Sequence, residues 1–238
     1  MRQVRKSLFE TNSSSTHAIA VTKEMQCETD YKEFFSFEGY CFGRCESHLV
    51  DTLCNKLAYV YIVVEDLINW KENEVMERHP DYTKEDFINT VIEISRKYFE
   101  EPEEEWMKRN AFNENNLKRF FNELNEKIKS YDAYVDHVED FVDNGFFERI
   151  ITDKEFLERL IFDEESYITV GGDEYRGYNL KKVGFENDYD YSYNHDFERK
   201  YDDNKWPRWA DPTEMYVGEF WDKVKELRKD YDIYFKGN

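Results

Sequence analysis

A run of small polar side chains directly before a histidine is the strongest chemical signal in the sequence. Hydrogen-bonding side chains occupy residues 11–16, and His17 follows them. Hydroxyls and backbone amides in such a run can form a concave anion site, with His17 as acid, base or ligand. A serine near a histidine, here Ser13, can also be an activated nucleophile. The residues available for ligand binding are Asn12, Ser13, Ser14 and Ser15.

The same run also has a structural interpretation. Asn and Ser side chains bond neighbouring backbone groups and thereby stabilise tight turns. The run contains no glycine, so it is not a phosphate-binding loop of the usual type. The residue types therefore favour an ordered loop, with chemistry at this loop as the alternative.

The segment YVDHVED, residues 134–140, supplies a second pair of candidates for an enzyme, Asp136 and His137. In a helix, His137 lies at the edge of the apolar stripe and Asp136 lies nearly opposite that stripe. In an extended segment the two side chains also point apart. The spacing thus favours a boundary histidine beside a solvated aspartate over a joint catalytic role.

The stretch ITVGGDEY contains two adjacent glycines, Gly171 and Gly172, followed by Asp173. Paired glycines permit positive φ in a turn, and an aspartate can stabilise that turn. The functional alternative is that the glycines allow a ligand to approach the backbone closely, with Asp173 as a ligand-binding residue.

Four residues have the types of zinc ligands in a compressed pattern, C-x3-C-x2-H-x5-C: Cys41, Cys45, His48 and Cys54. Structural zinc sites normally use two separated ligand pairs. Free cysteines often serve as small buried apolar residues. We therefore expect reduced, metal-free cysteines and no cofactor.

Residues 185–212 combine aromatic and acidic residues without a clear period. Tyr and Trp are favoured anchors of protein interfaces, and carboxylates between them can engage Arg and Lys of a partner. The alternative is an ordered loop that packs its rings on its own domain. The residues assigned to partner binding are Asp188, Tyr189, Asp190, Tyr191, Asp202, Asp203 and Trp206.

The charge of the chain is one-sided, with 53 acidic and 33 basic residues and a net charge of −20. Such a chain repels phosphate backbones and anionic lipids, so we expect no direct nucleic-acid or membrane binding. Its surface either maintains solubility through self-repulsion or occupies a basic surface of a protein partner.

The chain carries no obvious targeting signal. No apolar run of signal-peptide length follows Met1, and the apolar stretch at residues 57–64 is too short to span a bilayer. We expect a cytoplasmic protein with reduced cysteines.

The secondary-structure patterns indicate an α+β fold in one domain, residues 1–238, with a possible subdivision at residue 165. Alternation predicts a strand at 16–22 with His17, Ile19 and Val21 on one face. Capping patterns and apolar spacing predict a helical middle, with helices at about 47–70, 83–101, 113–130 and 132–144 and one that begins at a capping box of Thr152 and Glu155.

The last part of the chain is expected to return to strands. The sequence predicts a hairpin across the GGDE turn, with strands at residues 166–170 and 175–183. A helix follows residue 211, and residues 231–235 are expected to form a final strand.

The opening motif resembles that of proteins from Firmicutes and their phages that begin with R-x-x-x-FETNSSS-x-H. Here Arg5 precedes LFETNSSSTHAI, and softer similarity continues in FEGYCFGR, KLAYVYI, YVDH and FDEESYITVGGDEY. The resemblance implies no particular activity. It implies a phage or mobile-element origin and a site around His17, with Asp136, His137 or Asp173 nearby in space.

Two functions are consistent with these patterns. The first is an acidic phage-type binding protein that antagonises a host defence or nucleic-acid-processing protein, in the host cytosol, by occupying a basic surface. The second is an enzyme of nucleotide or phosphate chemistry that uses the 11–17 loop and His17. A third hypothesis is a structural or oligomeric protein. No complete catalytic constellation follows from these residues, so the sequence favours the binding protein.

Overall fold

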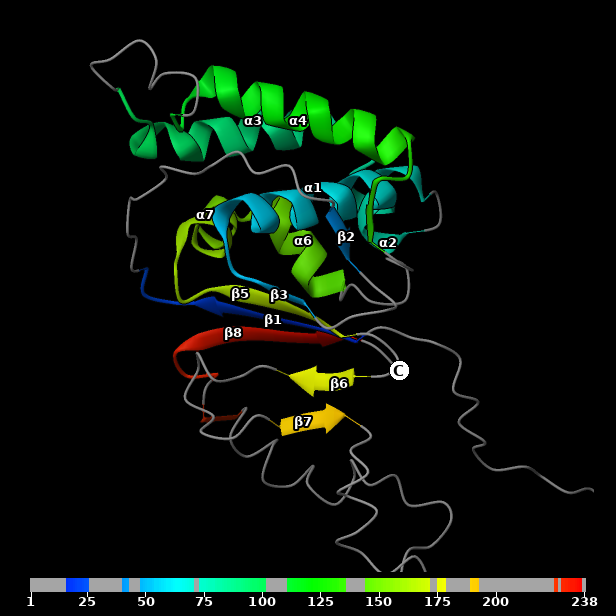
Figure 1. Ribbon diagram of the computed structural model, residues 1–238, viewed down its shortest axis with the longest axis vertical. Helices are drawn as coiled ribbons and strands as arrows, with labels where there is room; N and C mark the ends of the chain where they lie inside the picture. The colour runs from blue at the N-terminus through cyan, green and yellow to red at the C-terminus, as the bar shows by residue number, and fades with distance from the viewer. Residues whose placement is uncertain are drawn as a thin grey trace, which may run out of the picture.

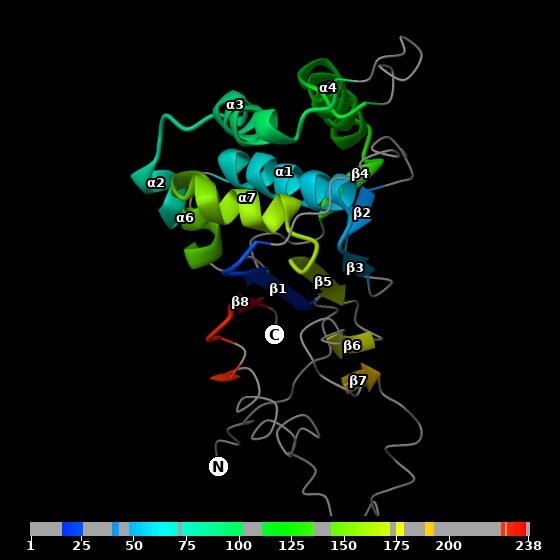
Figure 2. The same ribbon diagram turned by 90° about the vertical axis from the view of Figure 1, so that its left-hand side faces the viewer.

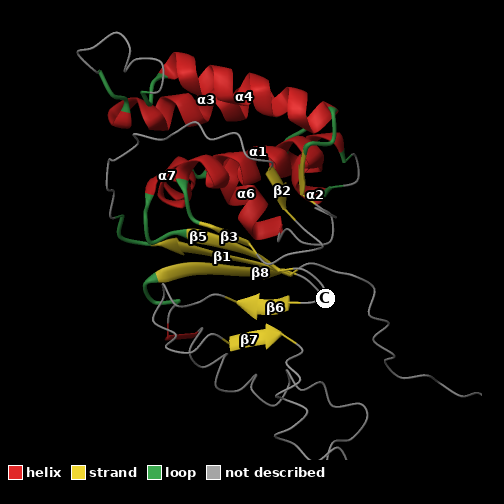
Figure 3. Ribbon diagram, viewed as in Figure 1, coloured by secondary structure: helices red, strands yellow, loops and turns green. Residues whose placement is uncertain are grey.

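The computed structural model has an α+β fold, with both helices and strands (Figure 3). In chain order, most strands lie near the two ends and most helices lie between them. The described residues are 16–25, 40–42, 48–70, 73–101, 111–135, 144–171, 175–178, 189–192, 225–226 and 228–236. This arrangement confirms the predicted fold class.

A four-stranded sheet with the order β3-β5-β1-β8 supports the fold. Its strands are β1 (Thr16–Thr22), β3 (His48–Val50), β5 (Tyr167–Gly171) and β8 (Tyr231–Lys236). Each neighbouring pair is antiparallel. Since β1 lies between β5 and β8, both of its edges are paired (Figure 1).

The helices lie on one side of this sheet in two layers (Figures 1 and 2). The inner layer contains α1 (Leu53–Asn69), α6 (Asn144–Thr152) and α7 (Lys154–Phe162). The outer layer contains α3 (Lys84–Ser95) and α4 (Glu114–Lys129). Two short helices, α2 (Glu74–Arg78) and η1 (Arg96–Tyr98), flank α3.

Helix α1 is the centre of the core. Every residue from Lys56 to Val64 is buried, because α1 contacts other elements all round instead of on a single stripe. Thr52 caps its first turn by accepting from the Asn55 amide. Tertiary burial outweighs the lower helix propensity of its β-branched residues. Neither α1 nor any other helix within the described stretches is long and apolar enough to cross a membrane.

Aromatic rings connect the two helical layers. Tyr61 of α1 lies 6.0 Å from Phe87 of α3 and 5.0 Å from Phe121 of α4, between ring centroids. Phe87 and Phe121 also meet edge to face at 6.2 Å. The edge-to-face pair and the two tilted pairs all lie within about 4.5–7 Å between ring centroids, the favourable range for aromatic pairs.

The predicted helix starts are confirmed at two places and wrong at a third. Thr83 and Asp86 form a reciprocal capping box, and Asn113 caps α4. Helix α7 is capped by Asp153, whose carboxylate accepts from the Phe156 amide, instead of by Thr152. The Thr152 hydroxyl donates to the Glu148 carbonyl, so it belongs to the preceding helix.

Two segments predicted as helical are strands. Residues 48–50 form β3, and helix α1 begins only at Leu53. Ala133–Val135 forms β4, which pairs in parallel with β2 (Tyr40–Phe42). Tyr131, with φ of 61°, redirects the chain after α4. The remainder of that predicted helix, residues 136–143, lies outside the described residues, and α6 begins at Asn144.

The predicted hairpin across the GGDE turn is also wrong in its pairing. Strand β5 is already bonded on both edges, to β3 and β1. Strand β6 (Tyr175–Tyr178) pairs with β7 (Tyr189–Ser192) instead, in a separate two-stranded sheet. This pair lies on the side of the main sheet away from the helices (Figures 1 and 2). The final strand, β8, is confirmed, whereas the helix predicted after residue 211 lies mostly outside the described residues.

Candidate functional site

One row of the main sheet places His17 beside a lysine and in line with a second histidine. His17 of β1 is in register with Val170 of β5 and with Lys236 of β8. Val170 is in turn in register with His48 of β3. Residues paired across antiparallel strands share a face of the sheet. The row His48, Val170, His17, Lys236 therefore crosses all four strands on one face, and we call it the histidine row.

The histidine row lies on the helix-facing side of the sheet. Two residues along each strand, the next row on that face is Val50, Ile168, Ile19 and Tyr234. Tyr234 packs against Phe146 of α6 and Phe156 of α7, with centroid distances of 5.6 and 5.8 Å. Val170 itself is completely buried. The expectation that Ile19 and Val21 share a core face is confirmed, since both are buried in the main apolar cluster.

The histidine row is also at one end of the sheet. Strand β3 begins at His48, and β8 ends at Lys236. Thr16, the first residue of β1, pairs with Gly171, the last residue of β5. The chain therefore enters the sheet at this end from Asn12, Ser13, Ser14 and Ser15, and leaves β5 toward Asp173. These five candidates lie outside the described residues.

The other proposed catalytic residues, Asp136 and His137, also lie outside the described residues. They follow β4, which belongs to a different sheet from β1. Their joint role with His17 stays a prediction.

The proposed partner-binding segment is described at one strand. Tyr189, Asp190 and Tyr191 lie in β7, where they are in register with Tyr178, Gly177 and Arg176 of β6. Asp188, Asp202, Asp203 and Trp206 lie outside the described residues.

The described cysteines occupy separate environments. Cys41 is exposed, and its thiol donates to the Asp132 carbonyl at 3.6 Å. Desolvation, together with the charge of Asp132, raises the pKa of the Cys41 thiol, which disfavours a reactive thiolate. The Cys54 sulfur lies 2.9 Å from the Tyr40 hydroxyl. Among the described residues, no group of three or more His, Cys, Asp or Glu side chains is placed to hold a metal ion.

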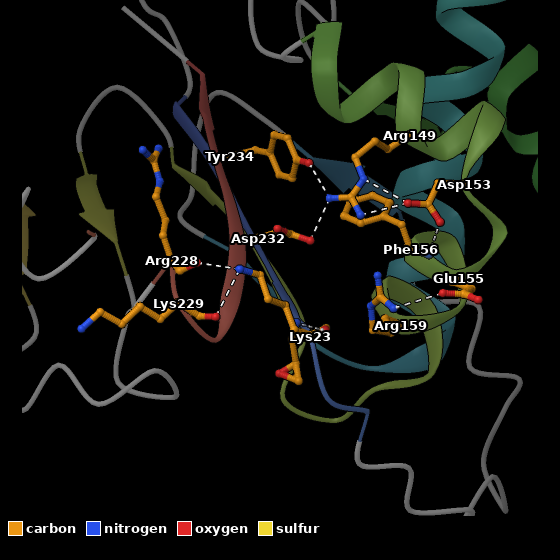
Figure 4. Close-up of polar contacts among 12 residues, drawn as sticks. Lys23, Arg149, Asp153, Glu155, Phe156, Arg159, Arg228, Lys229, Asp232 and Tyr234 are labelled. Carbon is orange, nitrogen blue, oxygen red and sulfur yellow. Dashed lines mark hydrogen bonds and ion pairs between the residues drawn. The ribbon is translucent and has the colours of Figure 1, made fainter. Parts of the chain in front are cut away.

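An arginine cluster that the sequence patterns did not reveal connects the inner helices to the sheet (Figure 4). Arg149 of α6 donates to the Asp232 carboxylate at 2.8 Å and to the Tyr234 hydroxyl at 2.9 Å. It also donates to Asp153 at 2.9 Å and stacks 4.0 Å from the ring centroid of Phe156. Because its guanidinium is bound on all these sides, the cluster positions α6, α7 and β8 and offers little to a ligand.

A second polar cluster joins α2 to α6. Glu148 binds Arg78 at 2.5 Å and the Nε2 atom of His79 at 2.9 Å. Hydrogen bonds from His79 and then Arg78 lower the pKa of the Glu148 carboxyl. The carboxylate is therefore held as an ionised link between two helices.

The sequence analysis identified the two histidines of the histidine row but not its lysine. His17 and His48 were both singled out, but separately, as a possible proton carrier and a possible zinc ligand. Lys236 carried no local signal, because its place beside His17 depends on the register of β1 with β8. Comparison with family models, curated proteins and solved structures finds no match for the chain, so its function has to be argued from its own residues.

Proposed function

We propose that the protein is an acidic, phage-type binding protein that antagonises a host defence or nucleic-acid-processing protein by occupying a basic surface. The observation that carries the proposal is the net charge of −20. Opposite charge steers association and selects partners, so a surface of this sign favours a basic partner.

The ion pairs of the helical layers support this proposal because they engage the cations internally. Basic side chains that lie within 2.9 Å of a carboxylate include Arg78, Lys97, Lys118, Lys129, Arg149 and Lys154. These cations already have acidic partners within the chain. Because the acidic residues outnumber the basic ones, carboxylates remain available to bind a basic partner.

The contact surface that we propose is the acidic and aromatic segment around Asp188–Trp206. Its tyrosines and tryptophans would supply the apolar anchors, and its aspartates would supply charge complementarity. The test reverses four charges together by replacing Asp188, Asp190, Asp202 and Asp203 with Lys. We expect this variant to keep its fold and to lose capture of the partner from a bacterial lysate, because solvated charges contribute little to stability.

A matched control separates a specific surface from bulk charge. Glu74, Glu77, Asp81 and Glu85 are exposed residues on or beside α2 and α3. Replacing these four with Lys changes the net charge equally. The control variant should still capture the partner, and capture by both proteins should weaken as salt rises. A folded Asp-to-Lys variant that captures the partner as the wild type does would refute the proposed surface.

The alternative function is an enzyme of nucleotide or phosphate chemistry that uses the 11–17 loop and His17. The register of His17 with Lys236 favours this alternative, since an imidazole and an ammonium group can act on the same phosphate. An enzyme would lose turnover of a phosphate substrate in His17→Ala without loss of thermal stability. The four charge reversals would then be nearly silent.

A further inference from the structure

We infer that Tyr131 and Asp132, where α4 leads into β4, form a contact site for an arginine side chain of a basic partner protein. The inference goes beyond the proposed function, because it assigns a contact outside residues 185–212. It rests on the backbone conformation of Tyr131, on the exposure of its ring and on the charge of the chain that follows.

Tyr131 occupies a backbone position that favours glycine. Its φ of 61° lies in the left-handed region, where a side chain with a Cβ is strained, and no other non-glycine residue in the described stretches has a positive φ. The Tyr131 amide donates to the Ile128 carbonyl at 3.1 Å. The Asp132 amide donates to the Lys127 carbonyl at 2.8 Å, which completes a Schellman motif at the end of α4. Glycine is the usual residue at this place in the motif, so a tyrosine here lowers stability.

The Tyr131 ring faces solvent. It is 84 % exposed, whereas the other exposed large hydrophobic residues in the described part of the chain, Met25, Trp70 and Tyr134, are 37–40 % exposed. Strained residues occur preferentially at functional sites, where the strained conformation serves a contact. Tyrosine is also a favoured anchor of protein interfaces. The ring is therefore available to another molecule.

A carboxylate follows the exposed ring in the chain. The Ser130 hydroxyl donates to the Asp132 carboxylate at 2.7 Å and thereby orients it. In β4, which lies beside β2 (Figure 2), Tyr134 is exposed between two buried residues. Strand alternation places Asp132 on the same side as Tyr134. An aromatic face and a carboxylate are the two groups that best bind a guanidinium, which stacks on rings and pairs with carboxylate oxygens.

The charge of this region favours a basic protein over a nucleic acid. Residues 131–143 contain five acidic residues and no Lys or Arg. These acids outnumber the two lysines in the last turn of α4, Lys127 and Lys129, and Lys129 already pairs with Glu126 at 2.7 Å. Such a segment attracts cations and repels phosphate. Arginine is favoured over lysine because its planar guanidinium is more weakly hydrated and stacks on a ring.

The test is an NMR titration of the full chain with a capped Gly-Arg-Arg-Gly peptide and with its lysine analogue. We expect the arginine peptide to shift the Tyr131 ring and Asp132 amide signals and to bind more tightly than the lysine peptide. Tyr131→Gly, followed at the Asp132 amide, should weaken binding about two- to fivefold, since it removes a cation–π contact at an exposed site. Tyr131→Phe keeps the ring and should bind as the wild type does.

The stability of Tyr131→Gly separates a contact site from a structural role. Because glycine adopts a positive φ without strain, this variant should fold and should raise Tm by about 1–4 °C in thermal denaturation. Asp132→Asn should also weaken binding of the arginine peptide. Its matched control is Asp81→Asn, which removes the same charge from an exposed residue before α3 and should leave binding unchanged.

The inference is overturned if Tyr131→Gly binds the arginine peptide as the wild type does, or if its Tm falls, since a fall would show that the ring stabilises the fold. Equal binding of the lysine peptide would overturn the choice of arginine. A single-stranded oligonucleotide that shifts the same signals would overturn the choice of a protein partner. The four Asp-to-Lys changes in the Asp188–Trp206 surface should leave this site intact, so failure of that surface and failure of this site are distinguishable.

Discussion

Lys56 is a charged side chain in the middle of the most apolar helix. It is 2 % exposed, and its Nζ donates to the carbonyls of Asp163 at 2.7 Å and Ser166 at 3.1 Å. These carbonyls belong to the turn between α7 and β5. Burying an ammonium group is costly unless it is hydrogen-bonded, so the turn and the lysine depend on one another.

We expect Lys56→Met to lower the free energy of unfolding by about 2–3 kcal/mol, because two buried carbonyls lose a charged donor. Urea denaturation at pH 7 measures the change. The control is Lys118→Met, whose side chain is 52 % exposed and pairs with Glu114. An exposed pair contributes about 0–1 kcal/mol. Equal losses in the two variants would show that burial of Lys56 has no special role.

At the scale of one element, the start of α3 is held by a titratable cap. Hydrogen bonds from the Thr83 side chain and backbone lower the pKa of the Asp86 carboxyl below its usual value. A carboxyl whose pKa is lower in the folded state adds stability above its unfolded pKa of about 3.9. That stability is lost as the pH falls through the lower, folded-state pKa.

We expect Thr83→Ala to destabilise the protein by about 1 kcal/mol at pH 7, because an N-cap side chain is lost. The variant should also lose less stability than the wild type between pH 5 and pH 2.5, since Asp86 loses its main donor. Urea denaturation at the two pH values measures both effects. Thr152→Ala, which removes a threonine that caps no helix, should change neither quantity much. If Thr83→Ala and the wild type lose the same free energy of unfolding between pH 5 and pH 2.5, this account of Asp86 is wrong.

Elements with local signals were predictable, and elements defined by distant partners were not. The caps at Thr83 and Asn113 stand beside apolar stripes, so α3 and α4 followed from the sequence. Ala133–Val135 has helical neighbours and becomes a strand only because Tyr40–Phe42 pairs with it. At the candidate site, His17 and its strand were predictable because the alternating pattern at residues 16–22 is a local signal. Its neighbour Lys236 was not, because only tertiary pairing sets that register.

At the scale of the whole molecule, the net charge of −20 opposes the compact state. Raising NaCl from 10 to 150 mM shortens the Debye length from about 30 to 8 Å and screens this repulsion. Screening also weakens surface ion pairs such as Lys154–Glu93, but each contributes only about 0–1 kcal/mol. We therefore expect Tm at pH 7 to rise by about 2–4 °C, or roughly 1 kcal/mol for this chain length.

Thermal denaturation followed by circular dichroism measures this rise. The control is the same salt series near pH 4.7, the isoelectric point calculated from the sequence. There the net repulsion vanishes, so salt should leave Tm unchanged or lower it. A Tm at pH 7 that falls with salt would show that attractive pairs outweigh the net charge.

The pairing of β1 with β8 has a consequence for synthesis on the ribosome. Lys23, just after β1, bonds the carbonyl of Arg228, just before β8, across a separation of 205 residues. At about 5–20 residues per second, translation of that interval takes roughly 10–40 s. Throughout that time β1, one of the two inner strands of the sheet, has at least one edge without its native partner, and such an edge can pair with other nascent chains. The rate of elongation therefore determines how long a growing polypeptide is exposed to aggregation before its sheet can close.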